Sequence, residues 1–327
     1  MKNKIDWSNY KFRASQCSKL LTGKIERISD LEPRIKELEY ERDNLVNSNG
    51  RKVKWTKTKE NELISLIENV KTPLFKRLPK TLTSELRKIH RSETFSRNFS
   101  FTNKYVQKGI DQEEDAITLY QNYRNKVLGI NTFFINNKKR LENDWISGEA
   151  DLTDTNDFES CNEGFDTKAS WELSTFPYKE DDLDYQYQIQ NQCYMWLGNC
   201  NKWTTAYCLV NNTEHLLNNE KQKWYYALGL HKTEGKSDEE LIKLQEIESE
   251  KYKELEVRLI FDYEKFVGEN EHIMEVTKKE WFENNYDIPL ENRVIEKVTI
   301  RNEDIIEKLK SRIMISREYL KYLDKNM

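Results

Sequence analysis

Three acidic residues and one lysine near the middle of the chain could together bind a divalent metal ion and cleave a phosphodiester. They are Glu113, Asp151, Asp166 and Lys168. Carboxylate oxygens are the hard ligands that Mg²⁺ prefers, usually completed by waters and substrate phosphates. A lysine beside such a site can orient or deprotonate a metal-bound water. Two metal ions would stabilise the attacking and the leaving oxygen of an in-line displacement at phosphorus.

The segment GFDTKASW, residues 164–171, has the alternation of a β-strand. In a strand, Asp166, Lys168 and Ser170 point to one face and the residues between them to the other. The Cα atoms of Asp166 and Lys168 would lie about 6.6 Å apart at a rise of ~3.3 Å per residue. Taken alone, such a pair is more often an exposed ion pair that contributes little to stability.

The other two carboxylates also have ordinary explanations when each is taken alone. A helix is predicted over about residues 108–124, where Glu113 shares a face with apolar side chains. A carboxylate on that face is costly unless it is paired, although a residue at the edge of the stripe can reach water. Asp151 ends the segment GEAD, in which small residues let the backbone approach another group closely. A polar hairpin turn is the simple alternative there.

A third element carries an amide that could support the lysine. The segment YQIQNQCYMWL lies in a helix predicted over residues 183–198. Gln190 shares one helical face with Tyr187, Tyr194 and Leu197, which places its amide on the buried side. A solvated helix that happens to carry several glutamines is the alternative.

The bulk properties of the chain limit its class. It has 327 residues, 37% hydrophobic and 34% charged, with a net charge of −4. This length can bury a sizeable core, and the charge argues mildly against a basic nucleic-acid binder without excluding one. The five cysteines form no tight CxxC pair, which indicates reduced thiols, disfavours an iron–sulfur cluster and predicts a cytoplasmic protein. With no apolar run of membrane-spanning length, no membrane contact is expected.

The remaining pattern predicts a mixed α/β fold. Helical periodicity predicts a hairpin over residues 25–70, a long charged helix over 238–266 and a last helix after residue 300. Strands are predicted in three segments between residues 131 and 171, and again over 204–212 and 292–300.

The order of these motifs resembles the PD-(D/E)XK nuclease superfamily, and within it the phage lambda-type and YqaJ-type recombination exonucleases. The segment KGIDQEEDA is similar to their G-x-x-x-E-x-x-A helix. GEAD and DTKASW resemble the motif ending in the metal-binding Asp and the (D/E)-x-K strand, and QNQCYMWL resembles the Q-x-Q-x-x-M-W helix. FRAS, near the N-terminus, resembles the 5′-phosphate-binding segment. The third acid is Asp rather than the commoner Glu, and the hairpin separates FRAS from the other motifs.

The resemblance implies a role for each matched residue. Asp151, Asp166 and Glu113 would bind Mg²⁺, with Mn²⁺ as a substitute. Lys168 would activate the water and Gln190 would position the lysine or the water. DNA phosphates would be bound by Arg13, Ser15 and Ser170.

The implied fold is a restriction-endonuclease-like core, a mixed central sheet flanked by helices, with a helical hairpin insertion and a mostly helical C-terminal region. The expected divisions are an N-terminal segment of the core (1–24), a helical insertion (25–100), the nuclease core (101–214), and a C-terminal extension packed on the core (215–327).

The implied function is Mg²⁺-dependent digestion of duplex DNA ends in the 5′→3′ direction, which leaves 3′ single strands for phage-type recombination. The partners that this implies are double-stranded DNA ends, a single-strand annealing protein and copies of the same chain in a ring. Three alternatives stay open. They are a structure-specific or nicking endonuclease of the same fold, a non-catalytic DNA-binding recombination scaffold, and an unrelated helical interaction protein.

Overall fold

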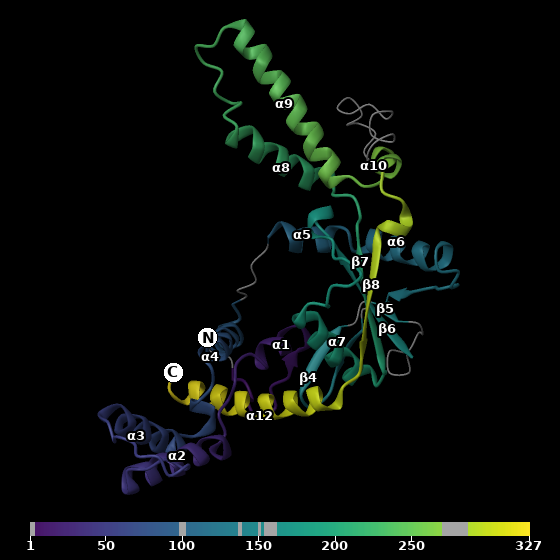
Figure 1. The fold of residues 1–327 in the computed structure, drawn as a ribbon. Coiled ribbons are helices and arrows are strands. Elements are labelled where there is room, and N and C mark those ends of the chain that lie inside the picture. Colours follow the sequence, from purple (N-terminus) through teal and green to yellow (C-terminus); the bar gives the residue numbers. More distant parts are fainter. Residues whose placement is uncertain (1–3, 98–102, 137–138, 150–151, 154–161, 270–286) are drawn as a thin grey trace. The chain divides into compact units, whose positions relative to one another are not determined.

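A computed structural model describes residues 4–97, 103–136, 139–149, 152–153, 162–269 and 287–327. The chain forms two compact units (Figure 1). The first comprises Met1–Phe99, Glu142–Gly148 and Asn302–Met327, and the second comprises Ser100–Leu141 and Glu149–Arg301. The contacts thus group residues 1–24 and the last helix with the predicted hairpin. The functional division into four segments stays a prediction.

The first unit is mainly helical. Thr56 caps the helix that follows it by accepting a hydrogen bond from the Lys59 amide, and Asn302 caps the last helix in the same way. The last helix packs against the first and fourth helices through an apolar stripe that includes Leu309, Ile313 and Leu320. The helices are α1 (Cys17–Leu20), α2 (Ile28–Asn44), α3 (Lys57–Lys71), α4 (Lys80–Phe95) and α12 (Glu303–Lys325).

A small three-stranded sheet joins the FRAS segment to the GEAD segment. Strand β1 (Phe12–Arg13) pairs in parallel with β4 (Ile146–Glu149), so that Phe12 lies opposite Ile146 and Arg13 opposite Ser147. The short β3 (Arg140–Glu142) completes the order β1-β4-β3. Two segments far apart in the sequence therefore lie side by side.

A five-stranded mixed sheet forms the centre of the second unit (Figure 1). Its order is β2-β5-β6-β7-β8, and only the β6–β7 pair is parallel. The strands are β2 (Ile135–Asn136), β5 (Leu152–Thr153), β6 (Glu163–Ala169), β7 (Lys202–Cys208) and β8 (Val294–Ile300). β6 and β7 are central, and both are largely buried.

Helices cover the two faces of this sheet. On one face, Ala116 and Tyr120 of α6 (Glu113–Lys126) join a core with Phe165, Ala206 and Cys208. On the other face lies α7 (Tyr185–Gly198), whose Tyr194 ring lies 5.0 Å from the Trp203 ring. Because side chains alternate along a strand, Asp166 and Lys168 point toward the α7 face. Gly164 is required on that face because a Cβ there would lie 2.0 Å from the Trp203 ring.

A helical hairpin lies between β7 and β8 in the sequence of the second unit. Its helices are α8 (Glu214–Ala227) and α9 (Asp238–Leu259), followed by α10 (Tyr263–Glu269). Leu216 and Leu217 of α8 pack with Leu255 and Leu259 of α9 in a second core that also contains Trp171. A buried ion pair, Lys221–Glu256 at 2.5 Å, joins the two helices.

The predicted mixed sheet flanked by helices is confirmed, and three details differ. The single helix expected over 108–124 is two helices, α5 (Lys104–Asp111) and α6, because Gln112 between them departs from helical geometry with φ −117° and ψ 17°. The strand expected in DWISGEADLTD is divided between β4 and β5, which belong to different sheets. The helix expected over 238–266 ends at Leu259, where Ile260 adopts an extended conformation.

Within the described part of the chain, no helix is both long enough and apolar enough to cross a membrane.

Candidate active site

Strand β6 carries a close acid–lysine pair, with Asp166 at its middle and Lys168 two residues further on. Lys168 Nζ lies 2.6 Å from Asp166 Oδ2, as the strand periodicity predicts. Asp166 is 2% exposed, whereas the Lys168 side chain is 24% exposed. The lysine also lies over the Tyr187 ring of α7, 4.9 Å from its centroid. The carboxylate is therefore held inside the protein, and the lysine head has access to solvent.

The neighbouring strand β7 supplies the wall of this site. Thr205 lies opposite Asp166, and Tyr207 lies opposite Lys168. Burial raises the pKa of the Tyr207 hydroxyl to about 12, helped by Tyr187 and Asp184. Burial, followed by the charge of Asp166, also raises the pKa of the Cys208 thiol. Both groups therefore stay neutral at physiological pH.

Helix α7 brings Gln190 and a neighbour that the sequence reasoning missed. Gln190 is half-buried, and its Nε2 donates to the Tyr194 hydroxyl at 2.8 Å. Asn191 is 1% exposed, and its Nδ2 donates to Thr205 at 2.9 Å and to Thr299 at 3.0 Å. Its Oδ1 is buried without a hydrogen-bond partner among the described residues. Asn191 thus fixes α7 against the strand residue beside Asp166, and only the pairing of β7 with β6 reveals this.

Glu113 opens α6 rather than lying within a longer helix. It is half-buried at the first position of α6, where the N-terminal end of the helix dipole favours a carboxylate. The apolar stripe expected around it is only partly present. Tyr120 is fully buried, whereas Ile110, which precedes the break between the helices, is 64% exposed.

Asp151 lies outside the described residues, so the structure gives it no position. The described part of GEAD belongs to β4, and the chain continues into β5 after the gap. Among the described residues, no three His, Cys, Asp or Glu side chains come together to form a metal site. Asp166 has the hard oxygen donors that suit Mg²⁺.

A buried lysine holds the segment that follows β6. Ser170 extends the strand pairing, since its amide donates to the Cys208 carbonyl at 2.9 Å, and its side chain is buried. Lys108 of α5 is fully buried and donates to the carbonyls of Trp171 at 3.3 Å and Val210 at 2.8 Å. Burial holds the pKa of Lys108 well below its ordinary value. This role is not predictable from the sequence around Lys108, which is mostly polar.

Arg13 and Ser15 belong to the first unit, where both side chains are exposed. Arg317 of α12 anchors the segment before them. Its Nε donates to the Tyr10 carbonyl at 2.9 Å and its Nη2 donates to the Asp144 carbonyl. The guanidinium lies 5.2 Å from the centre of the Trp145 ring. The last helix thereby fixes the start of β1 and the turn before β4.

Comparisons with known proteins identify a related fold. No protein-family model matches the chain, and no curated protein matches it. Among solved structures, the chain is similar to one described as a phage related exonuclease from Haemophilus somnus 129PT. The TM-score is 0.56 at 21% sequence identity, over 98% of this chain and 97% of the other. The likeness therefore covers both units and establishes a shared fold.

Proposed function

We propose that the protein is a Mg²⁺-dependent DNA exonuclease that digests duplex ends. The observation that carries the proposal is the buried Asp166 paired with the solvent-accessible Lys168 on the central strand of the sheet. The fold shared with the phage related exonuclease supports the choice of DNA as substrate. The motif resemblance supports it independently, because it rests on side chains that a fold comparison does not weigh.

The residues have separable roles in hydrolysis. Asp166, Asp151 and Glu113 would hold Mg²⁺, which supplies Lewis-acid stabilisation of charge at the phosphate. Lys168 would orient the attacking water and, after giving up its own proton, would accept a proton from that water as a neutral amine. The oxygen on the opposite side of phosphorus would leave and take up a proton from solvent. Gln190 would position Lys168 or the water. Arg13, Ser15 and Ser170 would bind backbone phosphates, which carry no base sequence information.

The finer features of the proposal come from the motif resemblance. They are digestion in the 5′→3′ direction, a 3′ single-stranded product, a single-strand annealing partner and a homo-oligomeric ring. Mn²⁺ would substitute for Mg²⁺, and the site of action would be the cytoplasm. Binding through phosphates should weaken steeply as the salt concentration rises.

The test is release of mononucleotides from linear 5′-phosphorylated duplex DNA in the presence of Mg²⁺. Asp166→Asn is expected to abolish release, as is chelation of the metal. Lys202→Ala is a matched control, because Lys202 forms a 2.9 Å pair with Glu163 at the other end of β6. An inert parent with both Mg²⁺ and Mn²⁺ would contradict the proposal.

A covalently closed circle in the same assay separates the alternatives. Cleavage of the circle would favour the structure-specific or nicking endonuclease. Binding of DNA without cleavage of either substrate would favour the non-catalytic scaffold. Duplexes labelled at the 5′ or the 3′ end give the direction of digestion.

A further inference from the structure

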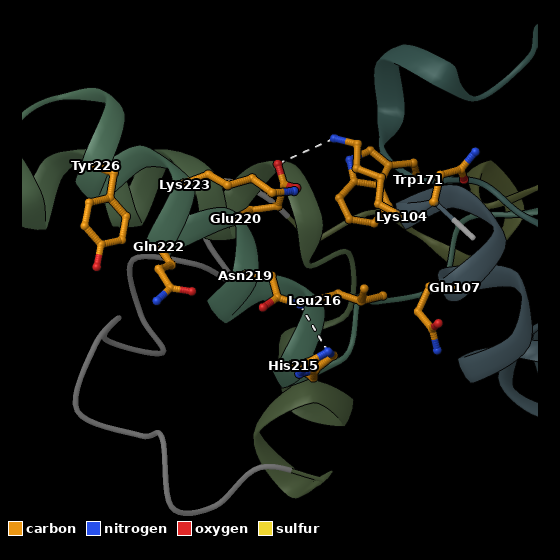
Figure 2. Close-up of a pocket in the computed structure, with 11 residues that line it drawn as sticks. Lys104, Gln107, Trp171, His215, Leu216, Asn219, Glu220, Gln222, Lys223 and Tyr226 are labelled. Carbon is orange, nitrogen blue, oxygen red and sulfur yellow. Dashed lines mark hydrogen bonds and ion pairs between the residues drawn. The ribbon is translucent and has the colours of Figure 1, made fainter. Parts of the chain in front are cut away.

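A pocket with charged and aromatic side chains in its lining lies just beyond the carboxyl end of β6. It has a volume of about 550 Å³ and lies between α5 and α8, with Trp171 in its wall (Figure 2). Trp171 follows Lys168 by three residues, so their Cα atoms are at most about 10 Å apart at ~3.3 Å per residue. The volume lies within the range of about 300–1,000 Å³ that is typical of small-ligand sites. It accommodates one nucleotide-sized group rather than a duplex.

The charged groups of this pocket favour an anion. Lys104 of α5 and Lys223 of α8 both line it, and Glu220 pairs with each of them, at 3.5 Å and 2.6 Å. Figure 2 shows the Glu220 carboxylate facing the Lys104 amine, which lies 4.4 Å from the centre of the Trp171 ring. Two lysines therefore face one carboxylate in the lining. The lining is therefore net positive in a chain whose net charge is −4.

The uncharged lining suits a nucleobase. Tyr226 of α8 lines the pocket and is 57% exposed. Its ring centroid lies 5.2 Å from that of His231 and 5.7 Å from that of Tyr225, and the exposed part of the ring can contact a base. Asn219 and Gln222 place amides in the same lining, and amides can pair with the edge of a base. Lysine, amide and aromatic side chains thus line one pocket, with Lys104 beside Trp171 and Lys223 on α8 near Glu220 (Figure 2).

We propose that this pocket binds one nucleotide of a single DNA strand, with its phosphate at Lys104 and Lys223 and its base against Tyr226. The choice of DNA rests on the proposed nuclease function. A released mononucleotide has the same chemistry as one unit of a strand, so the experiment must distinguish these two sources.

The experiment measures binding of a fluorescent single-stranded oligodeoxythymidylate by anisotropy. It uses the Asp166→Asn background without divalent metal, so that the strand stays intact. Combining Lys104→Ala with Lys223→Ala should weaken binding by about tenfold or more and make the salt dependence shallower. Tyr226→Ala should weaken binding by about tenfold.

Glu220→Gln is the most discriminating variant. It should strengthen binding of the oligonucleotide because it removes the carboxylate that pairs with Lys104 and Lys223. Glu239→Gln and Lys243→Ala are matched controls, since this exposed 3.3 Å pair lies on α9 outside the pocket. Both controls should leave binding unchanged. Thermal melting of every variant verifies that it is folded.

Three results would overturn the proposal. In the first, the lysine variants bind the oligonucleotide as tightly as the α9 controls do. In the second, Glu220→Gln weakens binding of the oligonucleotide. In the third, the protein binds deoxythymidine monophosphate but not the oligonucleotide. The proposed nuclease function is tested separately by mononucleotide release. If the parent releases no nucleotide but the pocket variants change binding, the pocket stands and the nuclease does not; the reverse pattern rejects the pocket alone.

Discussion

Two lysine–carboxylate pairs in the second unit look alike in distance and differ in surroundings. Asp166–Lys168 measures 2.6 Å on β6, and Lys221–Glu256 measures 2.5 Å between α8 and α9. In both pairs the carboxylate is almost completely buried. The lysine side chain is 24% exposed on β6 but only 10% exposed between the helices.

We infer from this difference that the Asp166–Lys168 pair can take part in a reaction, whereas the Lys221–Glu256 pair only holds two helices together. Lys221 and Glu256 lie on two packed helices, and the Lys221 amine faces the Tyr252 ring at 5.2 Å. Asp166 and Lys168 lie on the same strand, so their contact joins no separate elements. A short ion pair therefore carries no functional information by itself. What distinguishes the two is whether the lysine head remains accessible to water and substrate.

The largest expected effect separates the two pairs by activity. Lys168→Ala should lower the rate of mononucleotide release by about 10²–10⁴-fold, the range for loss of a group that transfers a proton. Lys221→Ala should leave the rate per folded molecule nearly unchanged. The measurement is a single-turnover rate on linear duplex DNA with Mg²⁺. Equal losses in both variants would remove the distinction.

The second-largest effect is expected in the free energy of unfolding, at the Lys221–Glu256 pair. Lys221→Ala leaves the buried Glu256 charge without its partner, which should lower the free energy of unfolding by about 3–5 kcal/mol. Replacing both residues, Lys221→Met with Glu256→Leu, should recover most of that loss because no charge then stays buried. Urea denaturation of the three proteins is the measurement. A double variant as unstable as the single one would contradict the account.

A smaller effect should depend on pH. Burial raises the pKa of Glu256 above its ordinary value of 4.5, although Lys221 opposes the shift. Between 4.5 and the raised pKa, the folded state therefore binds more protons at this site than the unfolded state. This contribution to the free energy of unfolding is complete below 4.5 and falls as pH rises through the window. The measurement is the free energy of unfolding from urea denaturation at several pH values above 4.5. The fall with rising pH should be absent in Glu256→Gln. If the parent and Glu256→Gln show the same dependence on pH, the raised pKa of Glu256 is contradicted.

The smallest effect is expected at the Lys202–Glu163 pair between β7 and β6, in which the lysine is exposed. Lys202 is 44% exposed in its pair with Glu163, so Lys202→Ala should change the free energy of unfolding by about 0–1 kcal/mol. It should not change the rate of hydrolysis. A large loss of activity in Lys202→Ala would mean that the active site reaches the Glu163 end of β6. It would also weaken the contrast between Lys202 and Lys168.

Local periodicity predicted the elements but not their grouping. The alternation in GFDTKASW predicts that Asp166 and Lys168 share a face, and the structure places them in contact. The same reasoning could not find the break at Gln112, since no proline or glycine marks it. It also could not foresee that ISGE and LT enter two different sheets, because strand pairing depends on segments distant in the sequence.

The sequence by itself determined the side chains available for chemistry and the face on which β6 presents them, because a strand repeats every two residues. Only the tertiary structure decided which residues surround them. The parallel pairing of β6 with β7 places Thr205 beside Asp166, and from there Asn191 connects to α7. The pocket beyond Trp171 likewise exists only because α5 and α8, more than a hundred residues apart, meet at the end of that strand. Such long-range pairing follows from burial of apolar surface, which no short segment encodes.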